Sequence, residues 1–562
     1  MGTISDKLMR IINTKEDIRK ALISKGYDVP TSVPFKEYAK MILDLPCKVD
    51  SFPDIEGIVA RYSASGLTNE QMAANSVWKD LTGNGHDLQM KNFSWKGMSG
   101  VGGYGDENHQ TFYKFTLDDY VFIATPPGVK HMNFTFRVTG LQPGNKLTLA
   151  FFGTTNTVYG TWNKDGIYTV DADIVEAGKP TYFYNGYSAT RGEFTIEILP
   201  LYPGALVFDG VDDWAGCDNL PLLPKEKGYS IIALRNWITR YDATQYKRPL
   251  ISNLGTNDEG AFLIEYRKDE NVNDVTGSYN SFTDVYIDDN NPITWQTSSS
   301  YNGQIIKKRT SKSTNKLCIC KTYFGQLSNY ANAAIWEIVI LDHDATEEEL
   351  TKIKDYFVKT YPWLFPDQAW TVTGKTNEDE GRATIANITG NGNDLVLSNF
   401  GFIEGSGYNK EGEYAGYLVT DGVDDKITSS IFEMGNDWTV IGDWELINTG
   451  KKDNAGIVKF DSIVIYNYNP ILINIKNGRN NLIPDQNTVN AICSDGRIYS
   501  KDWKESIYNE ETESTSKNFL TIGYSGNSYT KIAFKNLAIY PTVLSREDCI
   551  KAYNYLQTLK AK

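Results

Sequence analysis

Residues 206–213, LVFDGVDD, recur later in the chain as residues 418–425, LVTDGVDD. In both copies an apolar run leads into Asp-Gly, which readily forms a tight turn because glycine adopts positive φ without strain. The two copies lie 421 − 209 = 212 residues apart. A pattern of this length that recurs within one chain predicts a repeated structural module.

A second landmark precedes each of these stretches. Residues 80–88, DLTGNGHDL, match residues 387–395, NITGNGNDL, at an offset of 389 − 82 = 307. The offset then falls by 307 − 212 = 95, so the first copy of the module carries about 95 extra residues between its two landmarks. We place this insertion near residues 108–203.

A third landmark closes each copy. The apolar residues 338–341 match residues 537–540, and each run is followed by a stretch with helical periodicity. Thr346 and Ser545 head these stretches as N-caps, with acidic residues in the first turn, where the helix dipole favours them. Each copy is therefore predicted to end in one helix.

The insertion has a strand pattern of its own. Short apolar and β-branched runs are separated by Gly, Pro and Asn turns, which is typical of a small β-sandwich. The runs are residues 133–138, 146–151, 166–170 and 193–198.

The ordered landmarks resemble the laminin-G-like, or concanavalin-like, jelly-roll family. This resemblance covers about 400 of the 562 residues. It implies two antiparallel sheets packed face to face, an arrangement commonly used to bind carbohydrate. We therefore predict a mainly β protein with two jelly-roll β-sandwiches, an inserted small β-sandwich and a short α-helical N-terminal anchor. The expected boundaries are 1–48 for the anchor, 49–107 with 204–363 for the first sandwich, 108–203 for the insertion and 364–562 for the second sandwich.

The first 45 residues differ from the rest of the chain. Apolar residues at helical spacing follow Ser5, and Gly26 provides a stop before a second short amphipathic run at 35–43. Residues 12–26 and 34–42 resemble an N-terminal segment of bacteriophage tail-fibre and other appendage proteins. The resemblance implies attachment to other virion proteins, and a homotrimer. Two such helices do not bury a core by themselves, so the segment is expected to pack on another chain. A small helical cap on the following domain is the alternative.

Composition excludes several classes of partner. The net charge of −14 opposes binding to a nucleic acid backbone, and no apolar run approaches the roughly 18 residues of a membrane span. The six cysteines lack zinc-ligand spacing and are interpreted as reduced structural thiols. The N-terminus has no signal peptide, so we expect a protein made in the host cytoplasm and located in the virion.

The Asp-Gly turns are the candidate metal sites. Each gathers three carboxylates within five residues, and carboxylate oxygens are ligands for calcium. Turn formation alone also explains the motif and is the favoured interpretation, so no cofactor is expected and calcium is the one candidate ion. The residues are Asp209, Asp212, Asp213, Asp421, Asp424 and Asp425.

Sugar binding requires aromatic side chains that stack on pyranose rings. Core packing is the alternative role for every aromatic residue, above all for Trp237 and Trp438 in predicted strands. The candidate ligand-binding residues are Trp214, Trp295, Tyr301, Trp444 and Trp503.

Taken together, the sequence predicts a phage virion appendage protein, either a tail or a head fibre, that is structural and binds host-surface glycan. It is not expected to be an enzyme, because the landmarks that the two copies share are turn and core residues and not an acid/base pair. Four histidines and the lack of HExxH and GxSxG also disfavour a zinc hydrolase or a serine esterase. One alternative is a glycan-cleaving enzyme of the tailspike type, since two catalytic carboxylates can come from distant parts of a chain with 70 acidic residues. The other is a purely structural virion protein without a ligand.

Overall fold

The computed structural model consists of two compact units, Met1–Asp54 and Ile55–Lys562. Of the first unit it describes Lys15 and residues 52–54, so the predicted helical anchor lies outside the described residues. The described residues are 15, 52–103, 112–115, 120–123, 131–142, 144–153, 156–163, 165–176, 179, 181–186, 193–223, 227–238, 247–257, 261–269, 272–278, 285–287, 291–301, 304–305, 313–321, 330–410, 414–447, 456–460, 463–466, 471–475, 479–483, 489–500, 503, 505–507, 520–525 and 528–561.

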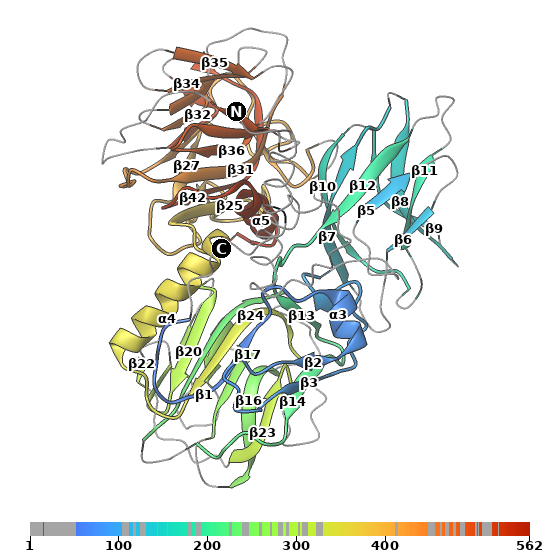
Figure 1. Cartoon of the computed structure of the whole chain (residues 1–562). Helices are drawn as coiled ribbons and strands as arrows, with labels where there is room; N and C mark the ends of the chain where they lie inside the picture. Colours follow the sequence, from blue (N-terminus) through green and yellow to red (C-terminus); the bar gives the residue numbers. More distant parts are fainter. Residues whose placement is uncertain are drawn as a thin grey trace, which may run out of the picture. The chain divides into compact units, whose positions relative to one another are not determined.

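The first module is a sandwich of two antiparallel sheets (Figure 1). One sheet has the order β22 (Gln304–Ile305), β21 (Ser300–Tyr301), β20 (Ile293–Thr297), β15 (Ser230–Trp237), β24 (Asn332–Leu341), β13 (Leu206–Asp209) and β4 (Gly100–Val101), with β1 (Ile58–Ser63) also paired to β24. The other has the order β19 (Val285–Ile287), β18 (Val272–Ser278), β17 (Leu263–Asp269), β16 (Lys247–Asn257), β23 (Ser313–Ile319), β14 (Trp214–Cys217), β3 (Leu88–Lys91) and β2 (Val77–Trp78). One hydrophobic core contains residues of both sheets, so the sheets pack face to face.

The inserted module is a smaller sandwich. Its sheets have the orders β10 (Gly166–Asp173), β7 (His131–Thr139), β12 (Phe194–Leu199), β5 (Phe112–Phe115) and β6 (Tyr120–Ile123), β11 (Thr181–Gly186), β8 (Lys146–Phe152), β9 (Asn156–Trp162). Phe136 of β7 lies 4.7 Å from Phe183 of β11, centroid to centroid, and 4.7 Å from Trp162 of β9. Aromatic contacts between the two sheets thus form its core.

The insertion enters and leaves the first module at neighbouring strands. Leu206 of β13 pairs with Val101 of β4, and the Gly102 amide donates to the Ala205 carbonyl at 2.8 Å. The chain therefore returns to the point from which it left, which is why the first module accommodates the extra residues.

The second module repeats the architecture of the first. One sheet has the order β28 (Gly407–Tyr408), β29 (Leu418–Val419), β42 (Ile532–Tyr540), β31 (Thr439–Leu446), β36 (Val489–Cys493), β37 (Arg497–Ser500) and β38 (Glu505–Ile507), with β25 (Gln368–Thr371) paired to β42. The other has the order β26 (Thr384–Ile385), β27 (Leu395–Ser398), β30 (Lys426–Ser429), β39 (Thr521–Ile522), β32 (Gly456–Phe460), β33 (Ile463–Tyr466), β34 (Ile471–Ile475) and β35 (Arg479–Ile483). A short hairpin, β40 (Tyr524–Ser525) with β41 (Ser528–Tyr529), stands apart. The predicted fold class, mainly β and built of β-sandwiches, is confirmed.

Both closing helices begin where the sequence predicts. Thr346 caps α4 (Glu347–Thr360) through a reciprocal bond with Glu349, and Ser545 caps α5 (Arg546–Leu556). A third helix, α3 (Asn69–Ala74), lies near the start of the first module. No helix in the described part of the chain is long and apolar enough to cross a membrane.

A buried ion pair holds α4 on the first module. Glu337 of β24 accepts from Arg61 at 3.1 Å and from the hydroxyls of Tyr356 and Tyr361 at 3.0 and 2.9 Å. Burial raises the pKa of Glu337 although the Arg61 guanidinium opposes the shift, and burial beside that carboxylate raises the pKa of Tyr356 to about 12. The equivalent positions of the second module hold Ala369 and Asn536.

The connection between helix α4 and the second module is short, and hydrogen bonds hold residues at both of its ends. Tyr361 ends α4 and bonds to Glu337, while Trp363, in the 3-10 turn η1 (Pro362–Leu364), accepts a hydrogen bond from Tyr540 at 3.1 Å. The Lys551 ammonium also lies 4.4 Å from the Trp363 ring centroid. Tyr361 is thus bonded to the first module, and Trp363, two residues later, is bonded to the second.

Candidate functional site

Each Asp-Gly turn links the two sheets of its module. In the first module the turn joins β13 to β14, and in the second it joins β29 to β30. Gly210 and Gly422 have φ of 75° and 76°, so both positions require the conformation that glycine adopts freely.

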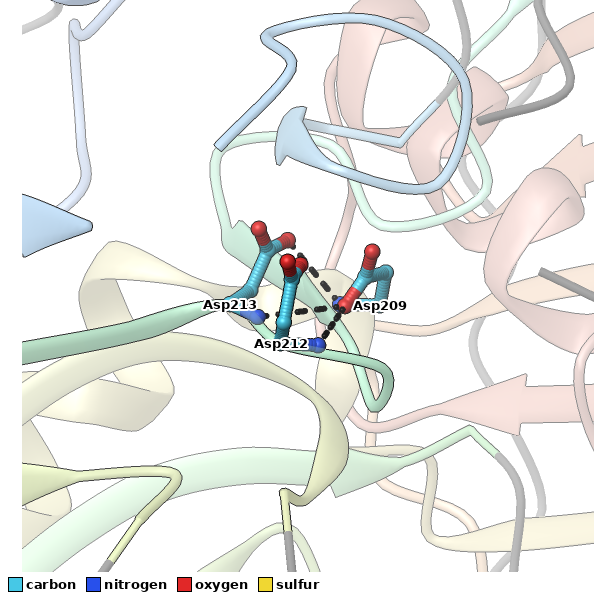
Figure 2. Close-up of side chains that lie close together, drawn as sticks. All are labelled: Asp209, Asp212 and Asp213. Atoms are coloured by element: carbon cyan, nitrogen blue, oxygen red, sulfur yellow. Dashed lines mark hydrogen bonds between the residues drawn. The ribbon is translucent and has the colours of Figure 1, made fainter. Parts of the chain in front are cut away.

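The carboxylates of the first turn are bonded to the turn's own backbone (Figure 2). Asp209 Oδ1 accepts from the amides of residues 211, 212 and 213 at 2.8, 3.3 and 3.4 Å. Asp213 Oδ2 in turn accepts from the Asp209 amide at 3.1 Å. This is the pattern by which aspartate stabilises a turn, and it needs no metal.

The second turn has the same bonds. Asp421 Oδ1 accepts from the amides of residues 423, 424 and 425 at 2.7, 3.3 and 3.3 Å, and Asp425 Oδ2 accepts from the Asp421 amide at 2.8 Å. Asn92 and Asn399 donate to the carbonyls of Asp212 and Asp424 at 2.9 and 3.0 Å. The whole arrangement is duplicated.

The turns also meet the geometric minimum for a cation. In each, one oxygen of every carboxylate lies within 4.8 Å of the others, and Figure 2 shows the three carboxylates of the first turn on one side of it. Burial, followed by repulsion from Asp209, raises the pKa of Asp213 well above its usual value, and burial raises the pKa of Asp425 to about 6. Turn hydrogen bonding accounts for Asp209 Oδ1 and Asp421 Oδ1, whereas Asp213 Oδ1 and Asp425 Oδ1 are buried and have no hydrogen-bond partner among the described residues.

The structure corrects two of the aromatic candidates. Trp444 is 4% exposed and Trp503 is 0% exposed, so neither offers a ring face to a ligand. Trp503 packs edge-on against Tyr553 of α5, with ring centroids 5.7 Å apart. Both residues belong to the interior, as do Trp237 and Trp438, for which core packing was the favoured role.

The remaining candidates differ in their settings. Trp295 of β20 is half-buried, and the Lys354 ammonium lies 5.5 Å from its ring centroid. The side chain of Tyr301 lies outside the described residues. Trp214 of β14 is half-buried and lies over Gly216, where a Cβ would come within 2.9 Å of the indole.

Trp214 belongs to a cluster that the sequence did not reveal. The Lys321 ammonium lies 4.6 Å from the Trp214 ring centroid and 5.3 Å from the Tyr330 ring centroid. All three side chains are half-buried, so the cluster forms part of the surface. We call Trp214, Lys321 and Tyr330 the first aromatic–lysine cluster.

The second module also has a cluster of one lysine and two aromatic rings, here two tyrosines in place of a tryptophan and a tyrosine. The Lys426 ammonium lies 5.9 Å from the ring centroid of Tyr524, whose ring is 5.0 Å from that of Tyr529. These side chains are also half-buried. Lys426, Tyr524 and Tyr529 form the second aromatic–lysine cluster.

The repeat offsets show that the two clusters occupy equivalent places in the two modules. Trp214 corresponds to Lys426 at 426 − 214 = 212, the offset of the Asp-Gly turns. Tyr330 corresponds to Tyr529 at 529 − 330 = 199, which equals the offset 537 − 338 of the last strands. Extending the internal alignment by a few residues would have found both pairs.

The third pair follows from backbone conformation. Cys320 and Gly523 directly follow β23 and β39, and both have positive φ, 58° and 77°. The next residues, Lys321 and Tyr524, are therefore equivalent. The lysine thus occupies a different position in each module, while the total of one lysine and two aromatic rings is kept.

Comparisons with known proteins do not assign a family. No family model matches the sequence, and no curated protein matches it. Among solved structures, Trypanosoma rangeli sialidase in complex with sialic acid has a TM-score of 0.26 and 9% identity over 77% of this chain and 70% of that chain. The botulinum neurotoxin serotype D binding domain has a TM-score of 0.23 and 10% identity over 61% of this chain and 88% of that chain.

The chain also matches Trypanosoma rangeli sialidase in complex with a difluorinated nononic acid at a TM-score of 0.20 and 10% identity, over 28% of each chain. This match covers just over a quarter of that chain. At these TM-scores none of the likenesses indicates an activity for this chain.

Proposed function

We propose that this chain is a glycan-binding appendage protein of a bacteriophage virion, with one binding site in each of two lectin-like modules. The observation that carries the proposal is the recurrence of the aromatic–lysine cluster beside the Asp-Gly turn in both modules. Core and turn residues recur because the fold requires them. A half-buried surface set that keeps one lysine and two aromatic rings while exchanging positions has no such reason to recur.

The clusters have the chemistry of a sugar site. Aromatic rings provide apolar faces for the C–H groups of a pyranose, and the lysine donates up to three hydrogen bonds to its oxygens. Two sites on one chain also raise the effective concentration of the second binding event, so weak individual contacts suffice for attachment. The virion role rests on the resemblance of the N-terminal segment to those of phage appendage proteins.

We propose a binding protein and not an enzyme, because each of the two described clusters consists of one lysine and two aromatic rings, without a carboxylate. The rival is glycan cleavage. New reducing ends released from host capsular polysaccharide by the full chain would establish that activity and contradict this part of the proposal.

A glycan array probed with the full-length protein tests the binding function. We expect binding that is lost in a Trp214→Ala/Tyr524→Ala double variant and kept in Phe152→Ala, which removes an exposed ring of the inserted module. Loss of binding in Phe152→Ala alone would place the site elsewhere. Absence of binding to every glycan would favour a purely structural virion protein.

The virion assignment is tested separately by deleting residues 1–48. We expect the truncated protein to bind glycan as before but to be missing from assembled particles. Incorporation of the truncated protein into virions would disprove the role of this segment as an anchor.

A further inference from the structure

The lysines of the two clusters differ in their electrostatic setting from Lys79, Lys410 and Lys551, and resemble Lys354 and Lys535, which also lie over aromatic rings. Lys79, Lys410 and Lys551 each lie within 2.6–2.8 Å of a carboxylate oxygen. Neither Lys321 nor Lys426 forms an ion pair with a described carboxylate; their contacts are with aromatic rings. In a chain with 70 acidic residues and a net charge of −14, these two half-buried ammonium groups form no described ion pair, although each cluster lies beside the three carboxylates of an Asp-Gly turn.

An ammonium group over an aromatic ring retains most of its ability to bind an anion. The cation–π contact at an exposed site is weak, whereas a charge-assisted hydrogen bond to a carboxylate is roughly twice as strong as a neutral one. Half-buried rings beside the lysine exclude water on one side and so strengthen its attraction for an opposite charge. A neutral sugar would use the hydrogen-bond donors of the lysine but not its charge.

We infer that both clusters bind acidic glycans, with a sugar carboxylate paired to Lys321 or Lys426 and the ring of the same or an adjacent sugar against the aromatic side chains. This inference rests on the proposed glycan-binding function and specifies the class of ligand. It also explains why the modules exchange positions within the cluster: a ligand with one charge and one apolar face requires one lysine beside aromatic rings, whatever strand supplies each.

Matched pairs of free acid and methyl ester test the inference, because esterification removes the charge and leaves the sugar otherwise unchanged. The probes are oligosaccharides of uronic and sialic acids and their methyl esters, titrated calorimetrically against the full-length protein. We expect the acid to bind at least about tenfold more tightly than the ester. This preference should weaken as salt is added, because salt screens the charge.

The variants assign the preference to the clusters. In Lys321→Met/Lys426→Met the ratio of acid to ester affinity should fall to about one, whereas Lys352→Met, which removes a lysine on α4 that pairs with Glu348, should leave the ratio unchanged. Equal affinity for acid and ester in the unmodified protein would overturn the inference and leave the proposed function intact. A preference that survives the double substitution would also overturn it. Failure of every acid, ester and neutral glycan to bind would refute the proposed function itself.

Discussion

Trp214 and Trp503 show how the same side chain serves two purposes in one chain. Trp214 lies on the outer side of β14 over a glycine, whereas Trp503 is fully buried against α5. Trp503→Ala should therefore lower the free energy of unfolding by about 3–5 kcal/mol, because it leaves a large cavity, and should leave glycan affinity of the folded protein unchanged.

Trp214→Ala is the matched substitution, and its expected effect is the reverse: reduced glycan binding with little change in the melting temperature. Thermal denaturation and calorimetric titration of both variants measure the difference. A Trp503→Ala variant that melts like the parent protein would contradict the assignment of this residue to the core.

Sequence alone did not separate these two residues, because neither stands in a motif that marks its surroundings. Trp214 begins β14 with its side chain over Gly216, whereas Trp503 lies in the connection between β37 and β38 and packs against α5. Both settings depend on contacts between segments that are distant in the sequence. Lys321 was missed for a related reason: it becomes a neighbour of Trp214 only when β14 and β23 pair.

His343 is predicted to make the first module more stable in mild acid. Partial burial disfavours its charged form, but hydrogen bonds with Asp342 at 3.1 Å and Glu349 at 3.2 Å outweigh that effect and raise the pKa of His343 above its usual value. Protonated His343 is thus more favourable in the folded state. This stabilisation is fully present below the unfolded pKa and is lost as pH rises through the raised folded value.

Denaturation of His343→Gln across pH 5 to 9 measures this contribution. We expect the substitution to destabilise the protein most at the acidic end and to have a smaller effect at pH 8 and above. A loss of stability that is the same at every pH would show that the charge of His343 has no part in it.

At the level of elements, the docking of α4 depends on a buried carboxylate. Arg61→Met leaves Glu337 without its cation, and removal of one partner of a buried pair costs about 3–5 kcal/mol. The second module does without this pair, since Ala369 and Asn536 occupy the equivalent positions, so the loss should affect only the first module.

Urea unfolding monitored by near-ultraviolet circular dichroism measures this loss, and Glu337→Gln in the same chain should recover part of it. Lys79→Met, which removes an exposed partner of Asp87, serves as the control and should change stability by less than about 1 kcal/mol. An Arg61→Met variant no less stable than this control would contradict a structural role for the pair.

The Asp-Gly turns are elements that we expect to fold without metal. Backbone amides already occupy Asp209 Oδ1 and Asp421 Oδ1, so the turn geometry is satisfied by the chain itself. Melting curves in millimolar calcium chloride and in EDTA should therefore coincide. A higher melting temperature in calcium that disappears in Asp212→Asn/Asp424→Asn would show that the carboxylates form a calcium site.

Across the whole molecule, most of the fold could be predicted from the internal repeat. Turn motifs and helix caps are local, so they can be recognised from the sequence alone. Examples are Gly210, Gly422, Thr346 and Ser545. Contacts between distant segments do not. Asn69 and Asn377 accept from the Val101 and Tyr408 amides, each at 2.7 Å, and this duplicated bond becomes evident only when the strands are in place.

The inserted module has one further consequence for the molecule as a whole. Its two ends meet where β13 pairs with β4: Leu206 pairs with Val101, and the Gly102 amide donates to the Ala205 carbonyl. We therefore expect that another small domain with closely spaced ends could replace this segment without altering the register of the host sheet.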